Sequence, residues 1–328
     1  DSTAGVYWRF SYGGSSDNIT VEYNAAPWTS AWTATTAFAH NTSDFSVWRN
    51  SSTVYIAYSE GGSIKISKGT LAATSITWDT TNTGACTSGV CTALSGSSST
   101  PYKYAYVTRD TTGNIWVNAR YYTGTNYYIR AVMSSSADTL TSWGTVADLS
   151  STSNTDANCY GTVSSLGSGN NVYAAWIRGT AIEGKKYTGS WPGSADSIAT
   201  GKSGLDSNFS MSSDTSNNLH LSYIESTGKI EYIKYNGTSW GSGSELDANT
   251  GNTYVSVSIN SANNNVYVIY IRSGGSSYYS LYTSSWSNGN ATGWSMGTSP
   301  KFLTSNYADP GRIFAMWTSG NAGSYSIN

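Results

Sequence analysis

Charged residues are scarce in this sequence, and their scarcity excludes several functions at the outset. Only 11% of the 328 residues are charged, and 17 Lys and Arg stand against 19 Asp and Glu, so the net charge is −2. Binding to nucleic acid through its phosphates needs a basic surface, which this composition does not provide. No apolar run reaches the roughly 20 residues that a membrane-spanning helix requires. We therefore expect no nucleic-acid partner and no membrane span.

Histidine and cysteine are also rare, with two and three copies. Two separated histidines, His40 and His220, do not make a zinc site or a Ser-His-Asp arrangement. His220 occupies a position that the other repeats give to Tyr, Trp or Phe, so we interpret it as a core residue. We accordingly expect no metal and no cofactor.

The sequence does contain a strand motif, which occurs in seven copies. It begins with an aliphatic residue and a ring-bearing residue, and the alternating residues that follow lead to a second ring-bearing residue. The copies are Val6–Phe10, Val54–Tyr58, Ile115–Ala119, Val172–Trp176, Leu219–Tyr223, Val266–Tyr270 and Ile313–Trp317. Their first residues are 48, 61, 57, 47, 47 and 47 positions apart, so units of this length fill the whole chain. Repeats near this length that carry several short strands indicate a β-propeller.

One repeat, residues 253–303, shows how a unit is organised. Two alternating strands, 254–259 and 266–271, flank an Asn-rich turn, a third strand follows Gly274-Gly275, and Trp294 opens a weaker fourth. Corresponding tryptophans precede the other fourth strands, at Trp32, Trp78, Trp143, Trp191 and Trp240. The sequence thus predicts an all-β, seven-bladed propeller of four-stranded antiparallel blades, formed as one domain over residues 1–328.

The two ends of the chain depart from this regular pattern. Five residues precede the first motif, which leaves no room for a first strand there, and after the seventh motif only one further strand, 323–327, remains. The terminal blades are therefore expected to be incomplete or shared. Unpaired strand edges accept strands from other chains. Candidate assembly residues are Val6, Tyr7 and Trp8 at one end and Tyr325 and Ile327 at the other.

The longest repeat interval contains two of the three cysteines, Cys86 and Cys91. Two cysteines in a short loop form a disulfide in an oxidising compartment or contribute to a metal site, and the absence of a nearby His favours the disulfide. The third, Cys159, lies in an apolar stretch and is interpreted as a buried thiol.

Six N-x-[ST] sequons indicate an exported protein. They begin at Asn18, Asn41, Asn50, Asn208, Asn236 and Asn290. Asn236 and Asn290 precede blade tryptophans and are the best glycosylation candidates, whereas Asn208 starts a strand and is the poorest. We expect an extracellular or cell-surface location and a processed start at Asp1.

The turn before one tryptophan carries a recognisable pattern. Residues 136–143, with Ser136, Asp138 and Trp143, resemble the Asp box of sialidase-like propellers, S-x-D-x-G-x-[ST]-W, except that Leu140 replaces Gly. Residues 287–294 resemble a degenerate copy. In that family the box lies between the third and fourth strands and is a folding element. The resemblance implies the fold and does not by itself imply sialidase activity.

The catalytic residues of that family do not transfer to this sequence. Its enzymes use three arginines, a Tyr–Glu pair and an Asp, but here Arg49 and Arg109 end first strands whereas Arg178 and Arg272 end second strands, at the opposite face. A second carboxylate pair, Glu225 and Glu231, flanks a hairpin turn and is interpreted as exposed charge. The sequence locates no catalytic residue, so we expect a protein that is not an enzyme.

Three functions remain open at this stage. The first is an extracellular structural or adhesive protein that polymerises head-to-tail through its incomplete edges. The second is a lectin-like propeller that binds cell-surface glycans. The third is a sialidase-like, carbohydrate-active enzyme.

Overall fold

The computed structural model describes residues 6–12, 18–25, 32–35, 38–50, 52–150, 159–202, 209–295, 302–305, 315–321 and 324–327. Every regular element in these ranges is a β-strand, so the all-β prediction is confirmed. None of the described segments forms a helix with the length and apolar character needed to span a bilayer. The chain divides into two compact units, Asp1–Ala157 and Asn158–Asn328, which are described separately below. The expectation of one domain stays a prediction.

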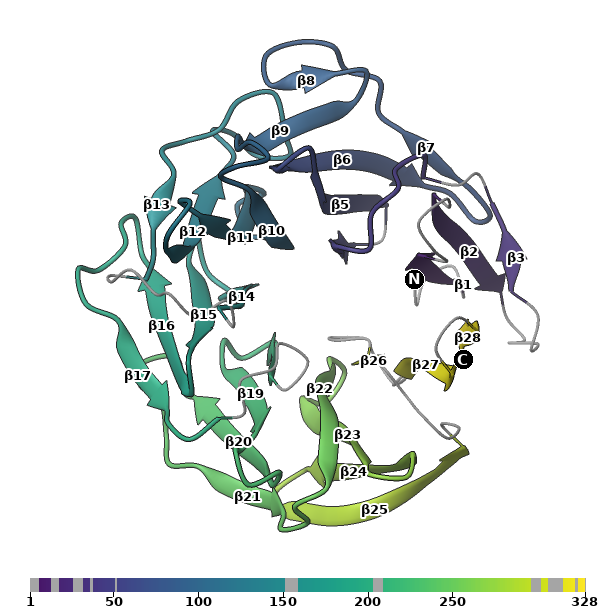
Figure 1. Ribbon diagram of the computed structural model, residues 1–328, viewed down its shortest axis with the longest axis vertical. Helices are drawn as coiled ribbons and strands as arrows, with labels where there is room; N and C mark the ends of the chain where they lie inside the picture. The colour runs from purple at the N-terminus through teal and green to yellow at the C-terminus, as the bar shows by residue number, and fades with distance from the viewer. Residues whose placement is uncertain are drawn as a thin grey trace. The chain divides into compact units, whose positions relative to one another are not determined.

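The first unit contains three antiparallel sheets, each following the chain order apart from one insertion (Figure 1). The first sheet contains β1 (Val6–Tyr12), β2 (Ile19–Ala25) and β3 (Thr33–Ala34). The second contains β4 (Phe45–Arg49), β5 (Thr53–Glu60), β6 (Ser63–Leu71), β7 (Ile76–Trp78), β8 (Cys86–Thr87) and β9 (Val90–Leu94). The third contains β10 (Tyr102–Arg109), β11 (Ile115–Tyr122), β12 (Tyr127–Met133) and β13 (Ala147–Asp148).

The second unit contains four sheets of the same simple meander (Figure 1). Its first sheet contains β14 (Gly161–Ser165), β15 (Val172–Arg178), β16 (Ala181–Tyr187) and β17 (Asp196–Ala199). Its second contains β18 (Phe209–Ser213), β19 (Leu219–Ile224), β20 (Ile230–Tyr235) and β21 (Ser244–Asp247). The next is β22 (Asn252–Asn260), β23 (Asn265–Arg272), β24 (Ser276–Tyr282), β25 (Trp286–Ser295), and the last is β26 (Phe302–Ser305), β27 (Ala315–Asn321), β28 (Ser324–Ile327). Such four-stranded meanders are the blades of a β-propeller.

The predicted count of seven four-stranded blades is wrong. Five sheets have four strands or more, whereas the first and the last have three each within the described residues. The structure shows six blades instead of seven. The physical reason is that each motif copy predicts one strand, whereas a blade needs four paired strands, and the first and last motif copies lie in sheets of three. Within the described residues, the first sheet begins at its motif strand and the last ends with its third strand.

The fourth strand of the last complete sheet begins earlier than predicted. Trp286 starts β25, and its ring packs against Tyr232 and Tyr282, with ring centroids 4.7 and 5.3 Å away. Trp294 instead lies near the end of β25, with 39% of its surface exposed. The residues interpreted as a degenerate Asp box, 287–294, therefore form strand and not a turn, because Trp286 takes the packing position between the two tyrosines.

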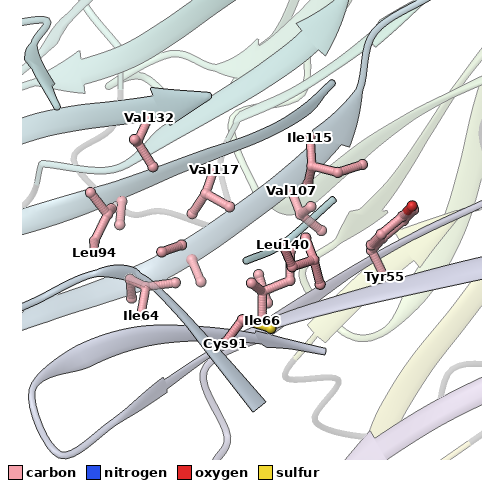
Figure 2. Close-up of a cluster of buried hydrophobic side chains, with 14 of the residues drawn as sticks. Tyr55, Ile64, Ile66, Cys91, Leu94, Val107, Ile115, Val117, Val132 and Leu140 are labelled. Atoms are coloured by element: carbon pink, nitrogen blue, oxygen red, sulfur yellow. The ribbon is translucent and has the colours of Figure 1, made fainter. Parts of the chain in front are cut away.

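The second sheet carries the insertion that makes its repeat interval long. The two ends of β6 pair with different strands, since β9 pairs with residues 64–66 and β7 with residues 69–71. The chain between β7 and β9 folds as a short hairpin closed by a disulfide between Cys86 and Cys91, as predicted. Both cysteines are buried in the core shared by the second and third sheets, and Figure 2 labels Cys91 there.

That core forms because alternate residues of adjacent sheets face each other. Figure 2 shows Ile64 and Ile66 of β6 with Val107 of β10 and Val117 of β11. Leu140, which replaces the family's Gly in the Asp-box-like turn, is also buried in this cluster. The departure from the family pattern therefore fills a core position.

Candidate functional site

One edge of the second sheet brings two opposite charges together. Lys68 lies on β6 opposite Tyr55 of β5, and the backbone N–H of Asp79 donates to the carbonyl of Lys68 at 2.9 Å. Thr70 and Thr77 are paired across β6 and β7, one step further along. Because side chains alternate along a strand, Lys68 and Thr70 share one face of β6. The edge therefore presents an ammonium, a carboxylate and two hydroxyls in close succession.

The Asp-box-like turn of the third sheet faces this edge. Asp138 has a left-handed backbone, with φ of 53°, and its carboxylate accepts two hydrogen bonds from Arg109, at 2.7 and 2.8 Å, and one from the hydroxyl of Tyr55, at 2.8 Å. The Arg109 bond holds the pKa of Asp138 below its usual value. Lys68 Nζ donates to the backbone carbonyl of Asp138 at 3.2 Å. Asp138 thus joins the two sheets, and its charge is balanced by Arg109.

The disulfide hairpin borders the same space. The N–H of Gly89 donates to the carbonyl of Thr81 at 2.8 Å, and the N–H of Ala85 donates to the carbonyl of Thr141 at 2.7 Å. The hairpin therefore contacts the segment that follows β7 on one side and the turn of the third sheet on the other.

Two open cavities lie here and share Lys68 and Asp79, the first between these three segments and the second along the exposed edge of β6 and β7. The first has a volume of about 150 Å³ and is lined by Lys68, Asp79, Thr81, Cys86, Asp138, Thr139, Leu140 and Thr141. The second has a volume of about 360 Å³ and is lined by Lys68, Thr70, Thr77, Trp78, Asp79 and Thr80. We refer to the two together as the Lys68–Asp79 cavity.

Hydrogen-bonding capacity remains on both charged groups of this cavity. Asp79 Oδ1 accepts from the N–H and the hydroxyl of Thr81, at 2.9 and 2.7 Å, and the hydroxyl bond lowers the pKa of Asp79. Both Thr81 bonds end on Oδ1, so Oδ2 keeps acceptor capacity. Lys68 Nζ has three hydrogens, of which the bond to Asp138 uses one. Trp78, which pairs with Gly69, points to the other face of β6, where its ring packs 4.5 Å from Phe38. The cavity thus combines an ionised acceptor and a cationic donor.

The sequence motifs locate only part of this site. The resemblance to the Asp box singles out Asp138, together with Ser136, whose carbonyl accepts from Ser134, and Trp143, which packs against the core of Figure 2. Sequence reasoning missed Lys68 and Asp79, because neither belongs to a motif. The available signal was the long interval around the cysteines, which marks an inserted loop beside them.

The carboxylates Glu225 and Glu231, interpreted from the sequence as exposed charges, are not both exposed in the structure. Glu231 on β20 is half-buried, and burial, together with repulsion from Glu225 and Glu245, raises its pKa to about 7. The interpretation was incomplete because it could not foresee the third carboxylate, which β21 places beside Glu231 through strand pairing. Within the described residues, no group of three or more His, Cys, Asp or Glu side chains is arranged to hold a metal ion.

The arginines lie at the strand ends that the sequence predicted. Arg109 ends β10, and Arg178 and Arg272 end β15 and β23. Arg178 pairs with Glu183, and Arg272 forms two hydrogen bonds, each of 2.9 Å, with Asp247. These three arginines are therefore engaged by carboxylates of their own units.

His220 is a core residue, as predicted. Only 2% of its surface is exposed, and its ring nitrogens contact the hydroxyl of Tyr232 at 2.6 Å and the carboxylate of Asp214 at 3.1 Å. Burial lowers the pKa of His220. Cys159 is buried and outside any disulfide, also as predicted.

The sequons occupy varied positions. Asn18, Asn41 and Asn236 are exposed, Asn50 is half-buried, and Asn208 lies outside the described residues. Asn290 was predicted to lie in a turn, but it lies within β25, opposite Tyr279. Glycosylation itself stays a prediction at all six positions.

The proposed assembly residues lie on outer strands of the terminal sheets. Val6, Tyr7 and Trp8 belong to β1, and Tyr325 and Ile327 belong to β28. Each strand has one neighbour in its own sheet, and head-to-tail assembly stays a prediction.

Comparison with known proteins identifies the fold and no sequence family. No family model and no curated protein matches this sequence. Among solved structures, the fungal lectin from Aleuria aurantia, described as a six-bladed propeller, is 14% identical and covers 86% of this chain and 92% of its own, with a TM-score of 0.53. AofleA from Arthrobotrys oligospora is 10% identical over 98% of this chain and 87% of its own, with a TM-score of 0.56. The fold is that of a β-propeller.

A third neighbour is an enzyme. The polysaccharide lyase Uly1 is 11% identical, with a TM-score of 0.55, and the match covers 98% of this chain and 86% of the lyase. At such identities the likeness concerns the fold alone, because one fold carries many functions.

Proposed function

We propose that this chain is a lectin-like, glycan-binding β-propeller that holds a sugar in the Lys68–Asp79 cavity. The observation that carries the proposal is the joint presence there of Asp79 Oδ2 and Lys68 Nζ, with Thr70 and Thr77 beside them. A sugar hydroxyl both donates and accepts hydrogen bonds, so adjacent hydroxyls suit a carboxylate beside an ammonium.

The charge balance of the cavity favours a neutral sugar. Asp138 is already paired with Arg109, which leaves Lys68 and Asp79 as one positive and one negative group. An acidic sugar placed on Lys68 would lie close to the Asp79 carboxylate, and like charges repel. A neutral polyol satisfies both groups without such a cost.

The structural neighbours support a sugar-binding role. The Aleuria aurantia lectin is described as having a novel fucose recognition mode, and SapL1, 11% identical with a TM-score of 0.53, is a lectin in complex with α-methyl fucoside. We propose a cell-surface glycan as the partner of this chain and an extracellular location. These neighbours agree better with the lectin-like function than with the structural, filament-forming one.

Absence of catalysis remains part of this proposal. Both carboxylates of the cavity have lowered pKa values, so neither suits the protonated acid of a glycosidase. The sialidase-like resemblance is thus proposed to reflect architecture alone, with the Asp-box-like turn serving to join sheets.

A glycan array is the direct test. The fluorescently labelled protein is applied to an array of neutral, fucosylated, sialylated and uronic-acid glycans, and each hit is measured by calorimetry with the free glycan. We expect binding to neutral glycans, and we expect Asp79→Asn and Lys68→Ala to weaken it about tenfold or more. Asp79→Asn keeps the Oδ1 acceptor used by Thr81 but replaces Oδ2 by a donor.

The control variant is Asp148→Asn, which changes a carboxylate of the same unit outside the cavity lining. It should bind as the wild type does. Absence of binding to every glycan, or wild-type affinity in both cavity variants, would contradict the proposal.

A further inference from the structure

The hairpin between β7 and β9 is a feature that the other sheets lack within the described residues. Eleven residues, 79–89, separate Trp78 from β9, whereas three or four residues separate Trp143, Trp191 and Trp240 from the fourth strands of their sheets. The inserted residues supply Asp79, Thr80, Thr81 and Cys86 to the lining of the Lys68–Asp79 cavity. The insertion therefore builds much of the cavity wall.

Close backbone contacts fix this hairpin on both sides of the cavity. A Cβ on Gly89 would lie 1.7 Å from the carbonyl oxygen of Asp79, and a Cβ on Gly84 would lie 2.2 Å from that of Thr141. Both glycines have positive φ, 80° and 60°, which favours glycine in itself. The backbone thus fits tightly against the segment that carries Asp79 and against the turn of the third sheet.

The disulfide closes the hairpin between these two contacts. Cys86 and Cys91 are direct partners across β8 and β9, and Cys86 itself lines the cavity. Gly84 and Ala85 precede Cys86, and Gly89 lies two residues before Cys91, so the cross-link restrains both contact points. A loop that is ordered before its ligand arrives does not lose that freedom on binding.

We propose that the Cys86–Cys91 disulfide hairpin is the affinity-determining element of the cavity, and that the disulfide orders Asp79 and the Thr139–Thr141 wall for a neutral sugar. The inference rests on the proposed function. A purely stabilising disulfide would affect the melting temperature and leave the affinity of the folded protein unchanged.

Two variants test the proposal on the same array of neutral glycans, below the melting temperature of each protein. Cys86→Ala/Cys91→Ala removes the cross-link, and Gly84→Ala displaces the hairpin from Thr141 with the disulfide intact. We expect both to lose about tenfold or more in affinity. We also expect faster amide hydrogen exchange at residues 79–81 and 139–141 in the cysteine variant.

Gly61→Ala is the matched control, because Gly61 has a φ of 59° and nothing lies within 4 Å of an added Cβ. It should keep wild-type affinity. The hairpin proposal is overturned if the folded cysteine variant and Gly84→Ala bind as the wild type does, or if Gly61→Ala loses as much affinity as they do. A wild-type protein that binds no neutral glycan would overturn both the proposed function and this inference. A wild-type protein that binds, with variants that bind equally well, would overturn the inference alone. If the cysteine variant does not fold, Gly84→Ala alone decides.

Discussion

Asp138 shows how single side chains join neighbouring sheets in this protein. Its carboxylate contacts Arg109 of its own sheet and Tyr55 of the preceding one. In the second unit, the hydroxyl of Tyr173 accepts from Trp240 of the next sheet at 2.7 Å, and Lys186 donates to the carbonyl of Gly237 at 2.9 Å. In both units the lysine opposite the motif ring contacts the turn before the tryptophan of the next sheet, while the ring itself contacts that turn through Asp138 or the tryptophan, Trp240.

Removing the Asp138 carboxylate is expected to weaken the first unit. Asp138→Ala leaves Arg109 and Tyr55 without their shared acceptor and should lower the free energy of unfolding by about 2 kcal/mol, as measured by urea denaturation. Asp148→Ala is the control, because the Asp148–Arg130 pair is exposed and should contribute less than about 1 kcal/mol. Equal losses in the two variants would contradict a special role for Asp138.

Glu231 is expected to make stability depend on pH. Its folded pKa, about 7, lies above its ordinary value of 4.5, so its contribution is fully present below about pH 4.5 and is lost as the pH rises through 7. Glu231→Gln should therefore raise the melting temperature more at pH 8 than at pH 5. Thermal unfolding at the two pH values measures this, and an equal change at both would argue against a raised pKa.

At the scale of single elements, an aspartate organises the turn between the first two strands of two sheets. Asp110 and Asp214 each accept two backbone N–H bonds within the turn, and each also accepts from the ring six residues later, Trp116 or His220. Hydrogen bonds from His220 and Asn218 outweigh burial and lower the pKa of Asp214 to about 2. His220 thus replaces a tryptophan N–H donor, which explains a histidine in a ring position.

Loss of this turn aspartate should be costly. Asp214→Ala removes the acceptor of two backbone groups and of the buried His220, so we expect a loss of about 3 kcal/mol in the free energy of unfolding. Thr215→Ala removes one exposed bond to Asn264 in the same turn and should cost about 0.5 kcal/mol. Denaturant titration of the two variants gives both values, and similar losses would refute the interpretation of Asp214.

At the scale of the whole molecule, the lectin-like and the structural functions predict different particles. The lectin-like function needs only discrete protein in solution, whereas head-to-tail strand addition produces fibres. We expect negative-stain microscopy and mass photometry of the purified protein to show discrete particles of one mass. Filaments that disappear when β1 is truncated would instead support assembly through the terminal sheets.

The sequence by itself determined the strands and their order. Alternation and the recurring ring predict a strand wherever one face is buried, so six of the seven motif copies place strands that the structure confirms throughout, and the seventh, partly outside the described residues, continues into β27. The pairing of Cys86 with Cys91 was also accessible, because so short a loop offers no other partner nearby. These features depend on contacts close in the sequence.

Only the tertiary structure decided the number of complete blades, the position of Trp286 and the candidate site. Lys68 and Asp138 are 70 residues apart and meet because the third sheet packs its Asp-box-like turn against β6. Nothing in the local pattern around Lys68 distinguishes it from a solvent-exposed strand lysine. A cavity forms where separate segments meet, and its lining depends on three-dimensional packing that no single repeat encodes.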